Sequence, residues 1–308
     1  MRILVTGGAG FIGSHISDAL LSRGNDVHVV DDLSGGYEAN VSPDAQLHAL
    51  DIRSAEAARL VHDLNPHAIV HLAAQMDVRK SVSDPSFDAD INVLGFLNLM
   101  EAARSTDLKK IVFASTGGAI YGEPDYVPQD ENHTIRPISP YGITKRVTEL
   151  YLNFYREIHG IDYVALRYSN VYGPRQNPHG EAGVVAIFIT KMLQGEQAVI
   201  NGEGKQTRDY VFVGDVVRAN LAALSYKGSG IFNIGTGVET DVNELFRLLR
   251  ELTGSTMEEK HVPGKVGEQM RSVLKAVKAS KILDWQPEVN LRDGLGKTIA
   301  WFDSVYQE

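Results

Sequence analysis

The stretch Arg2-Ile3-Leu4-Val5-Thr6-Gly7-Gly8-Ala9-Gly10-Phe11-Ile12-Gly13 decides the fold of this chain. It begins as a short β-branched apolar run, typical of a strand buried on both faces, and continues directly into a glycine-rich turn. The spacing of Gly7, Gly10 and Gly13 lets such a turn bend, approach a pyrophosphate and pack its helix closely against the strand. We therefore expect a dinucleotide-binding βαβ unit, with the phosphates at the helix N-terminus.

Asp31 ends the next predicted strand, at roughly the 20-residue offset expected for the acid that binds the adenosine ribose. A carboxylate there accepts hydrogen bonds from the ribose hydroxyls and repels a 2′-phosphate, which favours NAD over NADP. Asp32 either joins this site or only caps the following turn. Asp51 and Ile52 follow the presumed third strand, where we expect them beside the adenine.

Strand-like and helix-like patterns alternate over the first ~170 residues, as a parallel sheet requires. The sequence predicts strands at 3–5, 27–30, 68–72, 111–114 and 164–168, and helices at 12–23, 55–65, 90–104 and 140–159. We expect an α/β protein: a Rossmann-type doubly wound parallel sheet with a smaller α/β substrate-binding C-terminal lobe. The predicted division assigns 1–172 and a returning segment near 208–235 to the NAD-binding domain, and 173–207 and 236–308 to the smaller lobe.

The composition excludes several classes of function. The net charge is −9 and no basic run occurs, so we expect no nucleic-acid partner. The chain has no cysteine, which excludes disulfides and thiolate chemistry, and its ten histidines lack metal-ligand spacing, so we expect no metal. No signal peptide and no apolar stretch of about 20 residues is present, which predicts a cytoplasmic protein without a membrane span.

The segment Ser139-Pro140-Tyr141-Gly142-Ile143-Thr144-Lys145 carries the candidate chemistry. Ser139 suits an N-cap and Pro140 the first turn of a helix, which places Tyr141 and Lys145 one turn apart on the same face. An ammonium beside a phenol, with a cationic nicotinamide near by, would lower the pKa of Tyr141 and make it a usable general base. Taken alone, the pair could equally be an exposed helical pair.

These features together resemble the UDP-glucose 4-epimerases, an extended branch of the short-chain dehydrogenases. The resemblance spans nearly the whole chain and is strongest for the compact prokaryotic members. Its further motifs are Asp90-Ile91-Asn92-Val93, the segment 113–121, Leu166-Arg167-Tyr168-Ser169-Asn170, His179-Gly180-Glu181-Ala182-Gly183-Val184-Val185, Arg208-Asp209-Tyr210-Val211 and Asn233-Ile234-Gly235-Thr236-Gly237.

The resemblance implies reversible C4 epimerisation of a UDP-hexose through a transient 4-keto sugar, with NAD held tightly and regenerated each cycle, as in galactose metabolism. Tyr141 would exchange the O4 proton, and Lys145 would hold the nicotinamide ribose. The implied cofactor contacts are Gly7, Gly10, Phe11, Ile12, Gly13, Asp31, Asp32, Asp51, Ile52, Leu72, Ala73, Ala74, Gln75, Asn92, Ser115, Tyr141, Lys145 and Tyr168. The implied substrate contacts are Thr116, Gly117, Asn170, Gly183, Val184, Arg208, Arg271 and Ser272.

The chain departs from the family pattern at Gly117, where a serine or threonine usually binds O4. Three alternatives stay open: Thr116 supplies the hydroxyl, Ser115 supplies it, or Tyr141 contacts O4 directly. Our hypothesis is Thr116, the nearest hydroxyl. A second expectation concerns Ser272, which aligns loosely with the residue that gates a 2-N-acetyl group and predicts tolerance of UDP-N-acetylhexosamines.

Rival interpretations use the same fold. A UDP-glucuronate 4-epimerase differs only at the C6 pocket, whereas dehydratases and decarboxylases carry an acidic residue just after the threonine, where glycines stand here. A non-catalytic NAD-binding regulator would tolerate damage to Tyr141 or Lys145, and both are intact.

Relatives commonly dimerise through a four-helix bundle, so we expect a homodimer through helices 90–104 and 140–159, although Leu94, Leu97, Leu150 and Phe154 could equally face their own core.

Overall fold

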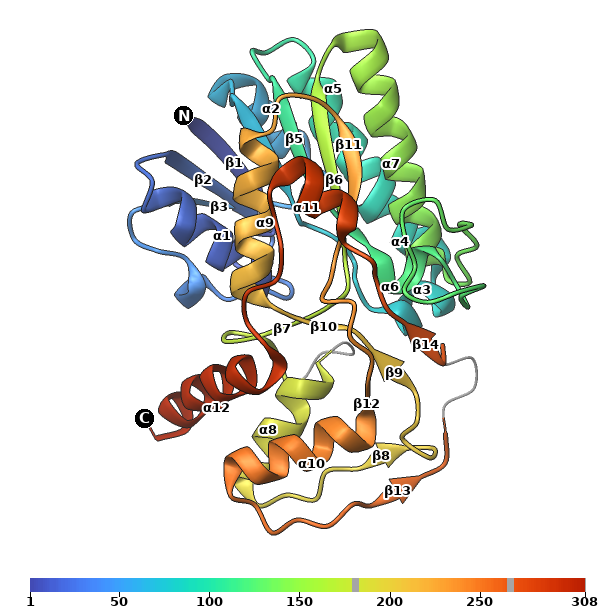
Figure 1. Cartoon of the computed structure of the whole chain (residues 1–308). Coiled ribbons are helices and arrows are strands. Elements are labelled where there is room, and N and C mark those ends of the chain that lie inside the picture. The colour runs from blue at the N-terminus through green and yellow to red at the C-terminus, as the bar shows by residue number, and fades with distance from the viewer. Residues whose placement is uncertain (179–182, 265–268, 308) are drawn as a thin grey trace.

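A seven-stranded, fully parallel sheet forms the centre of the larger lobe of the computed structural model, which describes residues 1–178, 183–264 and 269–307 (Figure 1). Its order from edge to edge is β3 (Gln46–Ala49), β2 (Asp26–Asp31), β1 (Arg2–Thr6), β4 (Ala68–His71), β5 (Lys110–Thr116), β6 (Asp162–Tyr168) and β11 (Gly230–Ile234). The order reverses between β1 and β4, and this switch point opens the crevice in which doubly wound sheets bind ligands.

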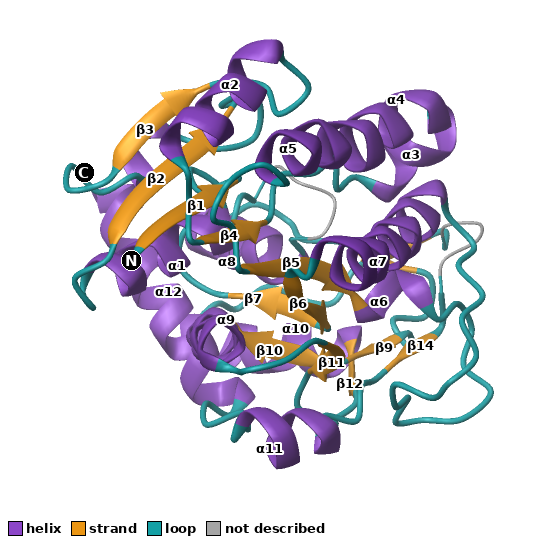
Figure 2. Ribbon diagram, turned by 90° about the horizontal axis from the view of Figure 1, so that it is seen from above, coloured by secondary structure: helices purple, strands orange, loops and turns teal. Residues whose placement is uncertain are grey.

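Helices cover both faces of the sheet, so its central strands are apolar on both sides (Figure 2). One face carries α1 (Phe11–Leu21), α9 (Val213–Ser225) and α11 (Val277–Leu283). The other carries α2 (Ala55–Leu64), α5 (Phe96–Ala103) and α7 (Pro140–His159), with α3 (Val78–Ser83), α4 (Pro85–Ala89) and the π-helical turn η2 (Asp90–Gly95) beside them. The predicted α/β class and doubly wound sheet are confirmed.

Helix α7 begins and ends where the sequence predicts. The Ser139 hydroxyl accepts a hydrogen bond from the Gly142 N–H, and Gly160 closes the helix in the left-handed conformation with φ +68°. The predicted helix 90–104 differs, because its first six residues form the π-helical turn η2 before α5 continues to Ala103. Such turns are frequent at functional sites, and this one carries Asn92.

The smaller lobe packs three helices against short strand pairs below the large lobe (Figure 1). Its helices are α8 (Val184–Gln194), α10 (Val242–Thr253) and α12 (Leu291–Gln307). Its strands pair as β8 (Ile200–Asn201) with β13 (His261–Val262), and as β9 (Thr207–Arg208) between β12 (Thr240–Asp241) and β14 (Arg271–Ser272). The pair of β7 (Asn170–Tyr172) with β10 (Tyr210–Phe212) joins this lobe to the large one.

The chain returns to the large lobe at a segment that the predicted division places in the smaller one. Residues 277–285, which the predicted division assigns to the smaller lobe, pack on the large sheet through α11. Ala279, Leu283 and Trp285 belong to the same buried cluster as the β1 core, and the Trp285 indole N–H donates to the Asp215 carbonyl at 2.8 Å. A seven-residue helix leaves too little pattern in the sequence to show which lobe it covers.

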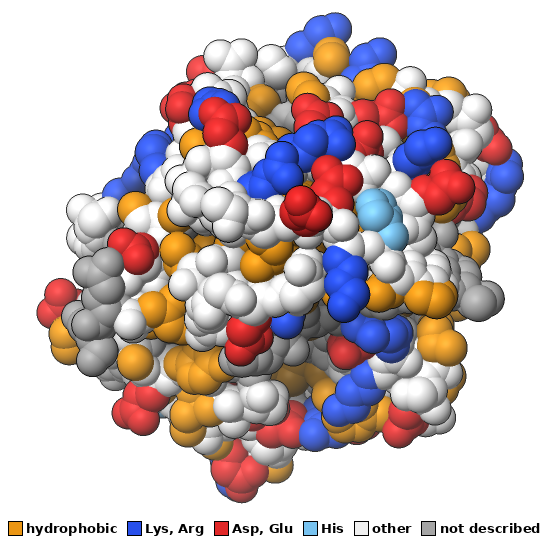
Figure 3. All heavy atoms as spheres, turned by 90° about the horizontal axis from the view of Figure 1, so that it is seen from below, with side chains coloured by type: hydrophobic (Ala, Val, Ile, Leu, Met, Phe, Trp, Pro, Cys, Tyr) orange, Lys and Arg blue, Asp and Glu red, His pale blue; other side chains and the backbone are white. Residues whose placement is uncertain are grey.

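Acidic and basic side chains intermingle over the face seen from below (Figure 3). Within the described residues, every helix is too short or too polar to cross a membrane.

Candidate active site

The glycine turn between β1 and α1 is packed closely against neighbouring backbone. Gly7 adopts φ +70°, and a Cβ there would lie 2.7 Å from the Ala73 nitrogen. A Cβ at Gly13 would lie 2.1 Å from the Gly7 oxygen, so α1 packs on the turn only because Gly13 lacks one. Helix α1 has Gly10 at its N-cap, no side-chain cap and no acid in its first turn. Its N-terminal N–H groups therefore suit a pyrophosphate.

Asp31 and Asp32 play different parts in the structure. The buried Asp31 carboxylate accepts the Ala9 N–H at 3.0 Å and the Leu33 N–H at 2.9 Å, which holds it against the glycine turn. Burial raises the pKa of Asp31. Asp32 instead accepts both the N–H and the hydroxyl of Ser34. Asp31 therefore lies against the glycine turn and stays the predicted ribose ligand, whereas Asp32 caps the turn after β2.

Tyr141 and Lys145 lie on the first two turns of α7, beside the end of β5. The Lys145 ammonium donates to the Ala114 carbonyl at 2.8 Å and lies 5.7 Å from the centroid of the Tyr141 ring. Burial lowers the pKa of Lys145 to about 8 and raises the pKa of Tyr141. For Tyr141 the causes are burial of the phenol and the charge of Asp88, whereas the predicted lowering of the Tyr141 pKa includes the charge of a bound nicotinamide and stays a prediction.

Two short strand pairs hold three of the predicted substrate contacts. Asn170 and Tyr210 are register partners in β7 and β10, and the Asn170 N–H donates to the Asp209 carbonyl at 2.9 Å. Arg208 pairs with Ser272 of β14, and its guanidinium reaches the Thr207 carbonyl at 2.8 Å. The structure therefore brings Asn170, Arg208 and Ser272, which are distant in sequence, to one side of the junction between the lobes.

Residues 3–235 match the NAD dependent epimerase/dehydratase family. The chain belongs to this family. It is 49% identical over 299 residues to a putative UDP-glucose 4-epimerase of Methanocaldococcus jannaschii, covering 97% of each chain. It is also similar to a Thermotoga maritima UDP-glucose 4-epimerase solved with UDP-glucose, with 48% identity, a TM-score of 0.97 and coverage of 99% of this chain and 100% of that one.

A Thermus thermophilus UDP-glucose 4-epimerase solved with NAD is 44% identical, with a TM-score of 0.92 and coverage of 98% and 99% of the two chains. The predicted family and NAD as its cofactor are thereby confirmed. The glycine turn fits this cofactor, since Gly7 and Gly13 allow its tight packing and the N-terminus of α1 has neither a side-chain cap nor an acid to compete with a pyrophosphate.

The candidate O4 hydroxyls of this family member occupy different surroundings. The Ser115 hydroxyl donates to Glu149 Oε1 at 2.7 Å inside the protein. Thr116 caps the short helix α6 (Gly117–Ile120), and its hydroxyl accepts the Ala119 N–H at 3.2 Å. A Cβ at Gly118 would lie 3.9 Å from the Thr116 hydroxyl and 4.0 Å from Asn170 Oδ1. The Thr116 hydroxyl therefore lies on the same side of Gly118 as the Asn170 side chain.

The loop after β4 joins the glycine turn, as expected for a cofactor contact. The N–H groups of Leu72 and Ala73 donate to the Thr6 carbonyl at 3.0 and 3.1 Å. Gln75 and Asn92 are further along and hold each other, because the Gln75 N–H donates to Asn92 Oδ1 and the Asn92 amide donates to the Gln75 carbonyl. Their side chains therefore shape the loop that carries Ala74.

Three other predicted cofactor contacts are engaged by protein groups. Asp51 forms a bidentate ion pair with Arg53, and Ile52 packs beneath Gly95. Tyr168 is buried, and its hydroxyl lies 2.8 Å from the Asn220 amide. The contact of Tyr168 with the cofactor stays a prediction.

The outer substrate residues are only partly described. Gly183 precedes α8 and Val184 begins it, whereas residues 179–182 of the same motif lie outside the described residues. Arg271 pairs with Glu239 at 2.8 and 2.6 Å. Ser272 is buried with no partner for its hydroxyl, and residues 265–268 before it are likewise outside the described residues.

Two buried acids support the site in roles that the sequence did not predict. Asp209 accepts N–H groups from Thr236, Gly237 and Leu274, so it anchors the 235–237 turn and the strand carrying Ser272. Glu149 binds Arg167 through both oxygens, at 2.8 and 2.7 Å. Glu149 lies one turn after Lys145. An acidic residue on the buried face of this helix is the sequence feature that could have indicated its role.

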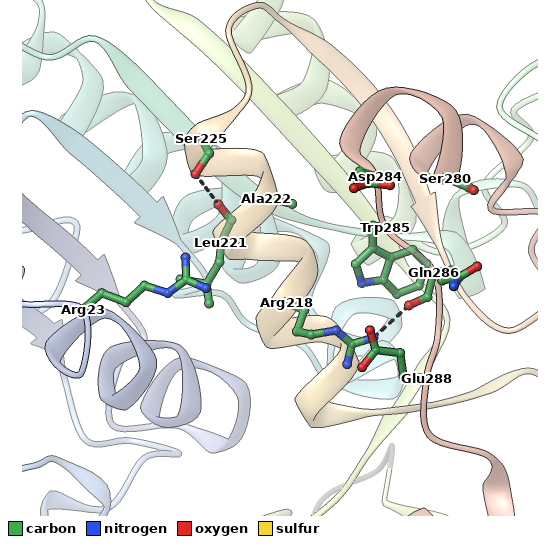
Figure 4. Close-up of a pocket in the computed structure, with 10 residues that line it drawn as sticks. All are labelled: Arg23, Arg218, Leu221, Ala222, Ser225, Ser280, Asp284, Trp285, Gln286 and Glu288. Carbon is green, nitrogen blue, oxygen red and sulfur yellow. Dashed lines mark hydrogen bonds and ion pairs between the residues drawn. The ribbon is translucent and has the colours of Figure 1, made fainter.

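A pocket between α9 and α11 lies apart from this site (Figure 4). Its lining residues are Arg23, Arg218, Leu221, Ala222, Ser225, Ser280, Asp284, Trp285, Gln286 and Glu288. Arg218 is already held by Asp215, Glu288 and the Gln286 carbonyl, so the pocket lacks a free anchoring cation on α9. In the described ranges, no cluster of three His, Asp or Glu side chains could hold a metal ion.

Proposed function

We propose that this chain catalyses the reversible inversion of the C4 hydroxyl of UDP-linked hexoses, such as UDP-glucose and UDP-galactose. The observation that carries the proposal is the placement of Tyr141 and Lys145 on the first turns of α7, beside Thr116 at the end of β5 and next to a glycine turn that fits NAD. The relatives named UDP-glucose 4-epimerase support the same reaction.

Each group has a definable task at the sugar. Tyr141 as phenolate takes the O4 proton during oxidation and returns it during reduction, and Thr116 holds O4 by its hydroxyl. NAD held at the Gly7–Gly13 turn and Asp31 would supply the hydride transfer at C4 in both directions. The Lys145 ammonium supplies the positive charge that favours the phenolate. Asn170 and Arg208 hold the UDP phosphates, for which a guanidinium offers charge and a forked donor set.

Epimerisation fits better than dehydration or decarboxylation. Reactions beyond C4 need an acid after Thr116, and Gly117 and Gly118 stand there. The space at Gly117 is filled by Leu274, whose Cδ1 atom lies 2.3 Å from the position that a Cβ would take. An apolar side chain offers no proton for elimination, so we expect epimerisation at C4 without dehydration or decarboxylation.

The range of sugars is the finer part of the proposal. Ser272 is a small residue in register with Arg208, which is consistent with tolerance of a 2-N-acetyl group. We propose that UDP-N-acetylhexosamines are accepted beside UDP-glucose and UDP-galactose, with UDP-glucuronate as the alternative substrate. The interconversion would belong to galactose metabolism in the cytoplasm, a reducing compartment consistent with a chain that has no cysteine.

We also propose a homodimer through η2, α5 and α7. Leu94, Leu150 and Phe154 are 57%, 54% and 44% exposed, whereas Leu97 packs against the core. Val147 and Tyr151 line an apolar surface pocket with Leu150 and Phe154. Contiguous apolar surface on one helix favours association with a second copy through the same face, as in a four-helix bundle.

The test is incubation of purified protein with UDP-galactose, UDP-N-acetylgalactosamine and UDP-glucuronate in separate reactions, with chromatographic separation of the epimers and no added cofactor. We expect conversion to the C4 epimer, with retained NAD serving each cycle. If all three donors stay unchanged even with added NAD, the 4-epimerase proposal falls. The donor converted fastest identifies the preferred sugar.

A further inference from the structure

Asp88 is a buried carboxylate behind the candidate active site, on α4. It is 0% exposed and accepts hydrogen bonds from the Gln75 amide at 2.9 Å, the Asn92 amide at 3.1 Å and the Thr144 hydroxyl at 2.8 Å. Within the described residues, no Lys, Arg or His nitrogen lies within ion-pair distance of it. A buried carboxylate without a paired cation is costly, so three donors must compensate for its lost hydration.

The Thr144 hydroxyl connects this carboxylate to the helix turn that carries Tyr141. The same hydroxyl lies 3.0 Å from the Tyr141 carbonyl, and Thr144 directly precedes Lys145. On the other side, Gln75 belongs to the loop that packs on the glycine turn. Asp88 is therefore tied to both the catalytic helix and the cofactor loop.

The charge of Asp88 also acts on the two catalytic groups. Burial has the larger effect on the pKa of both groups, and the negative charge of Asp88 has the next largest. This charge raises the pKa of Tyr141 further and partly offsets the lowering of the Lys145 pKa by burial. Other charged groups near α4 lie at the surface. Lys80 is exposed on α3, and Asp90 in η2 pairs with Arg53.

Two further groups complete the electrostatic surroundings. His71 on β4 is buried near Lys145. Burial and, to a smaller extent, the charge of Lys145 lower the pKa of His71. Asp77, at the start of α3, accepts the Lys80 N–H and presents its carbonyl to the Gln75 amide. Asp88 is thus the anion placed to act on both catalytic groups from within the protein.

We propose that Asp88 is a positioning residue of the reaction, whose buried negative charge sets the pH range over which Tyr141 and Lys145 hold the protonation states needed for proton exchange at O4. The inference rests on the proposed epimerase function. The charge keeps the Lys145 ammonium protonated in a dry site, and it delays ionisation of Tyr141.

The substitution Asp88→Asn tests the charge separately from the hydrogen bonds. The amide oxygen can accept from Gln75 and Asn92, and the amide N–H₂ can donate to the Thr144 hydroxyl, so every bond retains a partner. Loss of the charge favours the phenolate and disfavours the ammonium. We expect both limbs of the kcat/KM profile to move to lower pH by on the order of 1 pH unit.

Thr144→Val is the matched control, because it removes one hydrogen bond from Asp88 but no charge. It should lower kcat/KM while both limbs stay in place. A purely structural Asp88 would give Asp88→Asn the same behaviour, and that result would overturn the proposal. If Asp88→Asn fails to fold, Asp88→Ser provides a second neutral variant with the same expected shift.

A readout independent of turnover keeps the proposal separate from the epimerase function. The phenolate absorbance of Tyr141 is obtained as the difference between NAD-loaded protein and its Tyr141→Phe variant during a pH titration. Its midpoint should move to lower pH in Asp88→Asn, and an unmoved midpoint would contradict the role of the charge. If the parent converts no UDP-hexose yet the midpoint moves, the epimerase proposal fails while the electrostatic role of Asp88 stands.

Discussion

Leu274 fills the space beside Gly117 in which any other side chain would lie. Its Cδ1 and Cδ2 atoms are 2.3 and 2.8 Å from the position of a Cβ at Gly117, and Leu274 itself is 0% exposed. Leu274 follows β14 of the smaller lobe, whereas Gly117 follows β5 of the large one. Position 117 therefore lacks a serine or threonine hydroxyl for O4 in the same place where Leu274 packs between the two lobes.

Gly117→Ser should destabilise the protein by about 1–3 kcal/mol, because the new side chain overlaps Leu274 in a packed core. Leu274→Ala alone should cost about 2–5 kcal/mol through the cavity that it leaves. In the double variant the serine occupies that cavity, so the combined cost in urea denaturation should fall short of the sum by about 1 kcal/mol or more. Strict additivity would show that the two positions do not compete for one space.

Thr116→Ala should lower kcat by about 10²-fold or more, because O4 loses a positioned hydroxyl. Thr116→Ser keeps both the hydroxyl and the cap of α6, and should keep most of the activity. Steady-state rates with UDP-galactose measure both. Full activity in Thr116→Ala would end the role of Thr116.

Ser115→Ala separates the second hydroxyl from the first. The Ser115 hydroxyl is bonded to Glu149 within the buried Glu149–Arg167 pair, so its loss should cost about 1 kcal/mol of stability. We expect kcat to change little. A loss of kcat as large as that in Thr116→Ala, with unchanged thermal stability, would instead assign O4 to Ser115.

Tyr141→Phe should lose about 10²–10⁴-fold in turnover while still retaining NAD, because only the proton-exchanging hydroxyl is removed. Retained NAD is measured by absorbance after denaturation of the purified variant. This result separates an enzyme from an NAD-binding regulator, for which the substitution would be silent. Undiminished epimerisation in Tyr141→Phe would remove Tyr141 as the base.

Acid should destabilise the fold through His71. Burial, together with the charge of Lys145, lowers the pKa of His71 to about 3, whereas the unfolded chain titrates near 6.5. Below about pH 6.5 the unfolded state binds the additional proton, so stability is fully present above that pH and falls by up to about 1.4 kcal/mol per unit below it.

His71→Asn should therefore flatten the slope of stability between neutral pH and about pH 5, even if its stability at neutral pH is lower. Urea denaturation at several pH values gives that slope. His62, which is exposed on α2, provides the matched control variant His62→Asn. An unchanged slope in His71→Asn would mean that acid unfolding starts elsewhere.

Leu150→Glu should convert the proposed dimer into monomers, because a charge would be buried in the apolar face of α7. Val305→Glu, at a comparably exposed valine on α12, is the matched control and should leave the assembly unchanged. Sedimentation velocity distinguishes the two states. A parent protein that is already monomeric at all concentrations would dispose of the dimer.

Much of the fold and of the candidate site was predicted from local sequence patterns. The glycine spacing, the two-face apolar strands and the ends of α7 depend on neighbours in the chain, so the sheet, the cofactor turn and the Tyr141–Lys145 pair follow from the sequence. The return of α11 to the large sheet did not, because a short amphipathic helix carries no information on which sheet it covers.

By itself, the sequence determined the βαβ unit, the preference for NAD and the helix that presents Tyr141 and Lys145, since backbone geometry and residue spacing act over a few turns. Only the tertiary structure decided the rest. It directed Ser115 to Glu149, placed Leu274 against Gly117 and buried Asp88 behind Tyr141. These contacts join segments far apart in the chain, and the balance between burial and charge that sets the pKa of a catalytic group arises only when those segments pack together.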